Sequence, residues 1–197
     1  MMASHPAILF QLGASHHTAS LAVREKLALD DARASALATR VGQIAEVSEF
    51  ALVNTCNRVE LYGVASSPAA FPALHAALSA VTGCTTAELD SAVILRQNHA
   101  AIGHLFAVAA GLDSQILGET EILGQLKQAY DTALAHHWTG PVLNRVFQKT
   151  FQAAKHIRTN TGIGAGQISI ATVAVDLAGR IFGELAQIKI LVVGAGD

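Results

Sequence analysis

The chain has 197 residues, of which 51% are hydrophobic and 14% are charged, and its formal net charge is −2. This composition excludes a disordered chain, and two cysteines exclude a disulfide-framed secreted module. The charge excludes a globally basic nucleic-acid-binding protein, although not a local basic patch. No window approaches the roughly 18–20 apolar residues of a membrane span, and residues 1–6 lack a signal-peptide pattern. We therefore expect a cytoplasmic protein that does not contact a membrane.

The N-terminal half predicts a small domain of strands and helices. Apolar runs predict strands at 7–14, 49–53, 59–64 and 92–95. Helices are predicted at 30–44, where Asp30 can form the cap, and at 68–81. This order is typical of the α/β (α+β) class, and it favours a ferredoxin-like sandwich.

The chain becomes helical from residue 99 onward, with helices predicted at 100–110, 119–136 and 142–158. The last helix has an apolar face and an opposite basic stripe formed by Arg145, Lys149, Lys155, His156 and Arg158. Such a stripe can meet the phosphates of a nucleic acid, or it can be the solvated side of an amphipathic helix. The sequence leaves both interpretations open.

The C-terminal residues predict the start of a second domain. Three glycines at 161–167 indicate a hinge, a helix follows from Ser169 to about Phe182, and a strand is predicted at 189–193. A strand followed directly by Gly194-x-Gly196 resembles the opening of a dinucleotide-binding unit, although this short pattern is weak evidence by itself. We expect two domains, 1–160 and 161–197, the second being the truncated start of a Rossmann-type domain with Gly194 and Gly196 as cofactor-binding candidates.

Cys56 is the first candidate for chemistry, because it lies in the polar segment between two predicted strands. Thr55, Asn57 and Arg58 surround it, and nearby positive charge favours the reactive thiolate. The alternative is a half-buried cysteine in an ordinary hairpin. Cys84 has no charged neighbour and is interpreted as structural, and neither cysteine has the spacing of a zinc ligand, so we expect no metal site.

Three other features have two interpretations each. Arg58 is either a surface charge or a clamp that pairs bidentately with a carboxylate. His104 lies between Ile102 and Leu105, where a core histidine is more common than a catalytic one. The glycine-bounded segment 111–119 is either a shaped loop or a plain connection between helices that Asp113 or Ser114 caps.

Four segments in order resemble the glutamyl-tRNA reductase family over nearly the whole chain. The most specific is 54–62, which is similar to the family's nucleophile motif, and the second is 111–119 followed by 122–125. The others are 13–19 with Arg24-Glu25, and 158–164 leading to Ser169. Any one of these segments alone would be a weak signal, whereas the four in this order are a strong one.

The resemblance implies a two-step reduction that is the first step of five-carbon tetrapyrrole (haem) biosynthesis. Cys56 would attack the ester of glutamyl-tRNA(Glu) to form a thioester, and NADPH would reduce it to glutamate-1-semialdehyde. His104 would be a second catalytic residue near the thiol or the ester, which would overturn the core-histidine interpretation. The resemblance also implies substrate-binding residues, namely Thr55, Arg58, Ser114, Glu119 and Gln125. It further implies a homodimer for the full-length protein and docking to glutamate-1-semialdehyde aminomutase.

The chain departs from the family pattern at His17, Ser20 and Glu121, where Lys or Arg, Pro and Gln are usual. The largest expected departure is truncation of the NADPH-binding domain, so we expect this chain to lack complete reductase activity. One alternative is a non-catalytic module of the same fold that binds tRNA or a partner. Another is a thiol-dependent dehydrogenase of free aldehydes, which would keep the cysteine but would not need tRNA.

Overall fold

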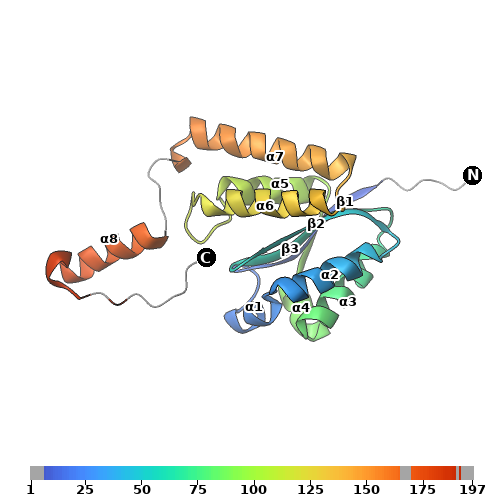
Figure 1. Cartoon of the computed structure of the whole chain (residues 1–197), viewed down its shortest axis with the longest axis horizontal. Helices are drawn as coiled ribbons and strands as arrows, with labels where there is room; N and C mark the ends of the chain where they lie inside the picture. The colour runs from blue at the N-terminus through green and yellow to red at the C-terminus, as the bar shows by residue number, and fades with distance from the viewer. Residues whose placement is uncertain (1–6, 165–169, 190, 192–197) are drawn as a thin grey trace, which may run out of the picture.

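A computed structural model describes residues 7–164, 170–189 and 191, and its centre is one antiparallel sheet of four strands (Figure 1). The order across the sheet is β2-β3-β1-β4. The strands span Ile8–Ser15 (β1), Val47–Thr55 (β2), Arg58–Ala65 (β3) and Ile94–Gln97 (β4). Helices follow β1 and β3, and β2 is joined to β3 by a tight hairpin. This is the ferredoxin-like order, so the predicted fold class is confirmed.

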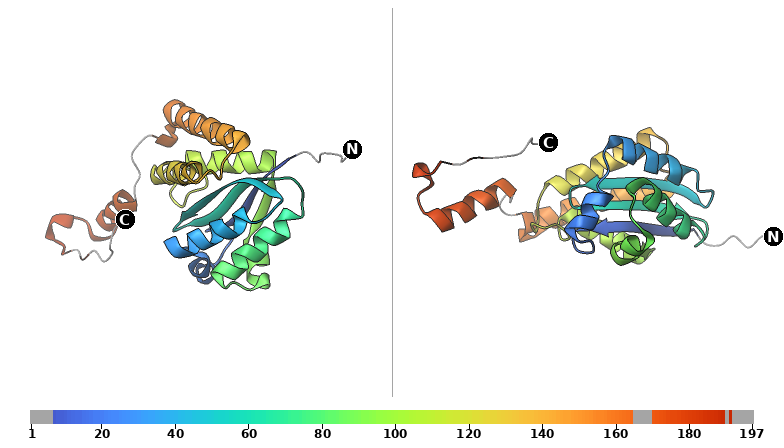
Figure 2. Two further views of the ribbon diagram at one scale, coloured as in Figure 1. Left: turned by 45° about the vertical axis from the view of Figure 1, so that its right-hand side comes forward. Right: turned by 90° about the horizontal axis from the view of Figure 1, so that it is seen from below.

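Helices cover both faces of the sheet (Figure 1, Figure 2). The first face carries α1 (Leu21–Leu27), α2 (Asp31–Gly42), α3 (Ala70–Thr82) and α4 (Thr86–Ala92). The second face carries the added helices α5 (His99–Ala110), α6 (Glu121–Ala135) and α7 (Pro141–Asn160). The chain continues through the short turn η1 (Gly162–Gly164) to α8 (Ile170–Phe182) and the turn η2 (Leu185–Gln187).

Local sequence signals explain where several helices begin and end. The Asp30 side chain accepts a hydrogen bond from the Arg33 amide at 2.8 Å, which starts α2 as predicted. Thr85 and Glu88 form a reciprocal capping box at the start of α4. Gly111 ends α5 at φ 79°, a left-handed conformation that glycine adopts without a steric penalty.

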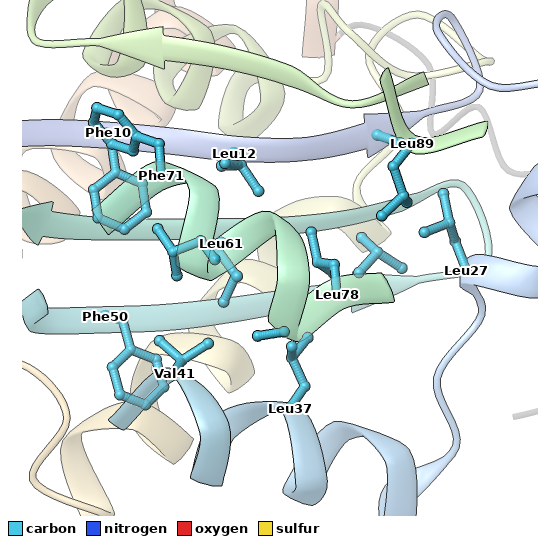
Figure 3. Close-up of a cluster of buried hydrophobic side chains, with 14 of the residues drawn as sticks. Phe10, Leu12, Leu27, Leu37, Val41, Phe50, Leu61, Phe71, Leu78 and Leu89 are labelled. Atoms are coloured by element: carbon cyan, nitrogen blue, oxygen red, sulfur yellow. The ribbon is translucent and has the colours of Figure 1, made fainter. Parts of the chain in front are cut away.

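Alternation along the strands divides the interior into two cores. On the face toward α2 and α3, Phe10, Leu12 and Leu61 pack with helix residues such as Leu37 and Leu78 (Figure 3). On the opposite face, the second core is formed by small and aromatic residues of the sheet together with α5, α6 and α7, including Ala51, Val53, Tyr62, Leu105 and Phe147. Because successive side chains of a strand point to opposite faces, β3 contributes to both cores.

Most predicted elements are confirmed, with two errors in the first half. The strand predicted at 92–95 begins two residues later, because Ala92 still belongs to α4. Helix α1 was not predicted, although Ser20 caps it by accepting a hydrogen bond from the Val23 amide. The predicted helix from Ser169 corresponds to α8, and Ser169 itself lies outside the described residues.

The prediction of a Rossmann-type start stays a prediction. The strand expected at 189–193 lies mostly outside the described residues, as do Gly194 and Gly196. Helix α8 lies apart from the sheet and its helices in both views (Figure 1, Figure 2). It exposes large apolar side chains, namely Val173, Val175, Leu177, Ile181 and Phe182. Among the described helices, none combines the length and the apolar character needed to cross a membrane.

Candidate active site

The turn between β2 and β3 presents Cys56 as an exposed, free thiol. The Thr55 hydroxyl oxygen accepts hydrogen bonds from the amides of Asn57 and Arg58, each at 3.2 Å. Arg24 donates to the side-chain oxygen of Asn57 at 3.4 Å. These contacts hold the backbone of the turn in shape, and the Cys56 side chain projects from it without being buried.

A small pocket of about 30 Å³ opens beside Cys56 between the hairpin turn, the 111–120 loop and the start of α6. Its lining includes all but one of the site residues predicted within the first domain, namely Thr55, Cys56, Arg58, Ser114, Glu119 and Gln125. Glu121, one of the departures from the family pattern, lines it as well. The hydroxyl oxygen of Ser114 is buried and has no hydrogen-bond partner within the described chain. The pocket therefore contains an unsatisfied polar group that a ligand could pair.

The loop 111–120 is shaped by two glycines and one arginine, which supports the first of its two interpretations. Gly111 and Gly118 have φ of 79° and 82°, and the Gly118 amide donates to the Gly111 carbonyl at 2.9 Å. The guanidinium of Arg158 donates to the carbonyls of Gly118 and Glu119. A Cβ at position 118 would lie 2.3 Å from the carbonyl oxygen of Ile163, so no other residue fits there without rearrangement.

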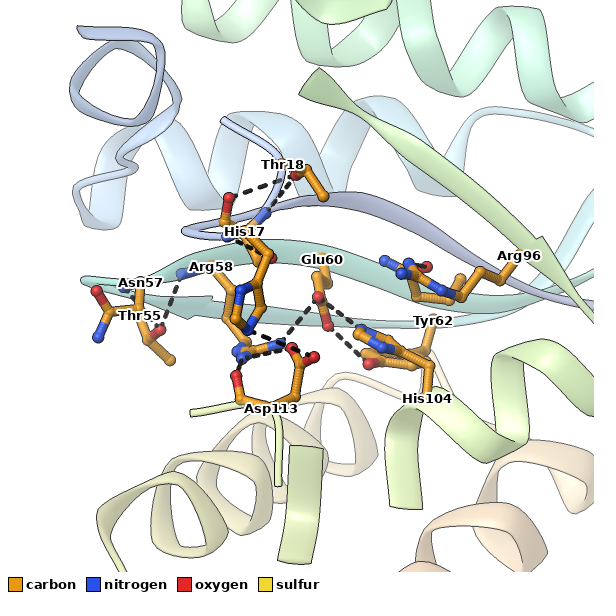
Figure 4. A network of polar contacts seen from close by, with 12 residues as sticks. His17, Thr18, Thr55, Asn57, Arg58, Glu60, Tyr62, Arg96, His104 and Asp113 are labelled. Carbon is orange, nitrogen blue, oxygen red and sulfur yellow. Dashed lines mark hydrogen bonds and ion pairs between the residues drawn. The ribbon is translucent and has the colours of Figure 1, made fainter. Parts of the chain in front are cut away.

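Behind the pocket lies a buried network of charged side chains (Figure 4). Arg58 Nη1 donates to Glu60 Oε1 at 3.1 Å, and the two side chains are only 1% and 2% exposed. His104 Nε2 lies 2.9 Å from the same oxygen, and the Tyr62 hydroxyl donates to Glu60 Oε2 at 2.7 Å. Since an ionised carboxylate only accepts hydrogen bonds, His104 must carry its proton on Nε2.

The network keeps Glu60 charged in spite of its burial. Burial alone would raise the pKa of Glu60, but the hydrogen bond from His104 and the positive charge of Arg58 outweigh it, and the pKa lies below its ordinary value of 4.5. Burial and then the Glu60 charge raise the pKa of Tyr62 well above 10, so the phenol stays a donor. The polar cluster is thus an internally neutralised unit rather than a set of independent groups.

Arg58 also contacts the 111–120 loop, where its second terminal nitrogen meets Asp113. Nη2 donates to the Asp113 main-chain oxygen at 2.7 Å and to its carboxylate Oδ2 at 3.0 Å. The carboxylate of Asp113 is 25% exposed, and His17 Nε2 lies 3.8 Å from its other oxygen. The guanidinium fork predicted to clamp a substrate carboxylate therefore already holds two carboxylates of its own chain.

The structure places one predicted site residue, His104, away from the Cys56 pocket. Its ring contacts Glu60 instead, in a side chain that is 8% exposed. The burial of His104 agrees with the core-histidine interpretation. Its partner Glu60 also accepts from Arg58, so His104 is connected to the site through that carboxylate. Sequence reasoning missed Glu60 and Tyr62, although Arg58, Glu60 and Tyr62 at alternate positions of a strand were a signal that they share one face.

The predicted basic stripe on α7 is not uniform. Arg158 is half-buried and turned toward the loop, whereas Lys149 is exposed and bonds only to Gln152 among the described residues. A broader groove of about 640 Å³ lies between α2 and α6 along β2, and Gln125 lines both this groove and the Cys56 pocket. Among the described residues, no group of three His, Cys, Asp or Glu side chains could hold a metal ion.

The fold and the pocket define a ferredoxin-like α+β domain with a hairpin cysteine beside a buried ion-pair network. The family described as "Glutamyl-tRNAGlu reductase, N-terminal domain" matches residues 12–161. The chain therefore belongs to the glutamyl-tRNA reductase family, as the sequence motifs suggested.

Curated relatives and a solved structure agree with this family. The glutamyl-tRNA reductases of Nitratidesulfovibrio vulgaris (strain Miyazaki F) and Solidesulfovibrio magneticus are 40% and 44% identical over 189 and 192 residues. These matches cover 96% of this chain and 42% of each relative. The structure of glutamyl-tRNA reductase from Methanopyrus kandleri matches with a TM-score of 0.69 at 32% identity, covering 96% of this chain and 44% of that one. The chain thus spans less than half the length of these relatives.

Proposed function

We propose that this domain binds glutamyl-tRNA(Glu) and accepts its glutamyl group as a thioester on Cys56, as part of an NADPH-dependent reductase of haem biosynthesis in the cytoplasm. The observation that carries the proposal is the free, exposed thiol of Cys56 on a hydrogen-bonded turn, beside a pocket lined by Ser114, Glu119 and Gln125. A free thiol at a rigid turn is suited to nucleophilic attack. The unpartnered Ser114 hydroxyl supplies a group that a bound ligand would satisfy.

The proposed step exchanges one acyl bond for another. The Cys56 sulfur attacks the carbonyl carbon of the ester, the bond from that carbon to the ribose oxygen breaks, and the ribose oxygen leaves with a proton. The product is a glutamyl thioester, which accepts hydride more readily than a carboxylate does. NADPH, when bound, would supply that hydride and release the aldehyde, and the residues predicted to hold it, Gly194 and Gly196, lie outside the described part of the chain.

The tRNA end needs a path away from the thiol. The groove along β2 is large enough for a nucleoside, and half of its lining residues carry neutral hydroxyl or amide side chains; Asp31, His136 and Trp138 line it as well. Because Gln125 borders both spaces, we place the terminal nucleoside in this groove. We also propose a homodimer of the full-length protein and docking of glutamate-1-semialdehyde aminomutase; both rest only on membership of the family.

The test is thioester trapping with tRNA that carries labelled glutamate. The protein is mixed with the charged tRNA and quenched in acid, and the label that hydroxylamine releases from it is measured. We expect label in the wild type and in Cys84→Ser, whose thiol is buried in the other core, and none in Cys56→Ser. Retained tRNA binding without any label would instead favour the non-catalytic binding module.

A further comparison separates the aldehyde dehydrogenase alternative. The same labelling is attempted with free glutamate in place of the charged tRNA. We expect no label, because free glutamate offers no activated ester for the Cys56 sulfur. Glutamate-1-semialdehyde, supplied with NADP⁺, tests oxidation of a free aldehyde; turnover that is independent of tRNA would support the alternative.

A further inference from the structure

The starting observation is that Arg58 has no free fork to offer a substrate. Its Nη1 donates to Glu60, its Nη2 donates to Asp113, and its side chain is 1% exposed. If Arg58 is to pair with the side-chain carboxylate of a glutamyl ester, one of its two present carboxylate partners has to leave. The partner that stays continues to balance the charge of the buried guanidinium, which would be strongly unfavourable without any carboxylate beside it.

The two partners differ in how easily they could leave. Glu60 is on β3, is 2% exposed, and also holds His104 and Tyr62. The side chain of Asp113 is 25% exposed and lies in the 111–120 loop, between the left-handed residues Gly111 and Gly118. Removing Glu60 would break three side-chain contacts, two within β3 and one to His104 on α5. Removing Asp113 would break its contacts with Arg58 and His17 and would require a rearrangement of this loop. Asp113 is therefore the exchangeable partner.

The size of the pocket agrees with an occupied site. Its volume of about 30 Å³ has room for about two water molecules and not for a glutamyl group. The Asp113 carboxylate takes the position on Arg58 that an incoming carboxylate would need. The neighbouring Ser114, whose hydroxyl is buried without a partner, belongs to the same loop. Movement of this one loop would open space, free the Arg58 fork and give Ser114 access to a ligand.

We propose that the Asp113 carboxylate is a built-in stand-in for the substrate's side-chain carboxylate, which displaces it from Arg58 when the glutamyl ester binds. This inference rests on the proposed function, because it assumes that Arg58 faces a glutamyl group. It assigns Asp113 a positioning role that keeps the second terminal nitrogen of the buried guanidinium hydrogen-bonded while the site is empty. The exchange lowers the apparent affinity for any carboxylate ligand, because the competent open state is only a fraction of the free protein.

The test uses small esters in place of the charged tRNA. Glutamate α-methyl ester has a free side-chain carboxylate, and glutamine methyl ester is its uncharged match. In a Cys84→Ser background, the rate at which iodoacetamide alkylates Cys56 is measured while either ester is added. We expect the glutamate ester to protect Cys56, with a half-protecting concentration at least fivefold lower in Asp113→Asn than in the parent. The glutamine ester is expected to protect neither protein.

Three controls separate exchange from simple damage. Asp113→Glu keeps a competing carboxylate and is expected to resemble the parent. Asp131→Asn removes an exposed carboxylate on α6 and is expected to change nothing. Circular dichroism and urea unfolding show whether Asp113→Asn is folded. If it is not, Asp113→Ser, which removes the same carboxylate, is measured in its place. We expect the same result for that variant.

Two results would overturn the inference. One is a half-protecting concentration of the glutamate ester that is equal or higher in the folded variant without the carboxylate than in the parent. The other is a complete lack of protection in both proteins.

In labelling with glutamyl-tRNA, we expect Asp113→Asn to lower the tRNA concentration for half-maximal label without raising the maximum. The two proposals can fail separately. If no thioester forms but the ester exchange is observed, the inference stands and the proposed function fails. If a thioester forms without the exchange, the proposed function stands and the inference fails.

Discussion

The two faces of the sheet are formed by the same strands but differ in the side chains that they bury. Toward α2 and α3, β3 presents Val59 and Leu61, and that layer is formed by apolar side chains. Toward α5 and α6, the same strand presents Arg58, Glu60 and Tyr62 at alternate positions, and charged groups are buried beside the second core. Strand β3 therefore borders a purely apolar core on one face and the charged network beside the Cys56 pocket on the other.

The difference shows what a buried charge requires. The apolar layer needs only a filled volume, and each residue contributes through burial and contact. In the polar layer, removal from water penalises every charge, and the layer is stable only if each group keeps its partner. We therefore expect substitutions in the first layer to alter stability alone, and substitutions of the charged groups in the second layer to alter stability and Cys56 chemistry together.

The largest combined effect on stability and labelling is expected at Glu60, where Glu60→Gln removes the charge that neutralises Arg58 and orients His104. We expect a loss of about 3 kcal/mol in the free energy of unfolding. Thioester labelling should fall as well, under conditions where the variant is still folded. Urea unfolding and labelling of the same sample check both parts. Full labelling by a folded Glu60→Gln would show that the network is only structural.

Leu61→Ala is the matched change on the other face, one residue further along β3. Leu61 is fully buried, so the substitution removes apolar contacts and leaves a cavity. We expect a loss of about 2–5 kcal/mol in the free energy of unfolding, of the same order as at Glu60. Below the unfolding transition, labelling of Cys56 should match the wild type. Reduced labelling in the folded variant would mean that the two layers are not independent.

Acid should weaken the region of the site in two stages, one at Glu60 and one at His16, whose amide donates to the Asn57 carbonyl of the hairpin turn at 2.9 Å. The pKa of His16 is lowered from 6.5, first by burial and then by the positive charges of His17 and Arg58, and the pKa of Glu60 is lowered from 4.5. Because the unfolded chain binds protons more readily at both groups, stability is present above these values and is lost as pH falls below them. The urea midpoint should decline first below about pH 6.5 and again below about pH 4.5. In His16→Asn, the first decline should be reduced and the second kept.

The smallest effect is expected at Tyr62, where Tyr62→Phe removes one hydrogen bond to Glu60 and keeps the ring. We expect a loss of about 1 kcal/mol in the free energy of unfolding. The Glu60 carboxylate keeps Arg58 and His104 as partners, so labelling should remain close to that of the wild type. A loss as large as that of Glu60→Gln would show that the phenol, and not the ion pair, supports the network.

The sequence predicted the fold better than it predicted the site's connections. Strand and helix periodicity identified the ferredoxin-like order, and the polar segment around Cys56 identified the hairpin turn. The contact of Arg58 with Asp113 joins residues 55 positions apart, and that of His104 with Glu60 joins residues 44 apart. No local pattern encodes such contacts, because they depend on how α5 and the following loop pack on the sheet. The sequence therefore identified Arg58 as a carboxylate clamp from its residue type, but it did not identify Asp113 as the carboxylate that Arg58 holds.

The position of Arg158 has a mechanical consequence. Its guanidinium holds the end of the 111–120 loop, and it lies two residues before α7 ends at Asn160. Directly after that helix, the carbonyl of Ile163 occupies the space that a side chain at Gly118 would need. A displacement of the chain beyond residue 160 would therefore strain the loop that carries Asp113 and Ser114. The junction couples the position of the segment after α7 to the wall of the thiol's pocket.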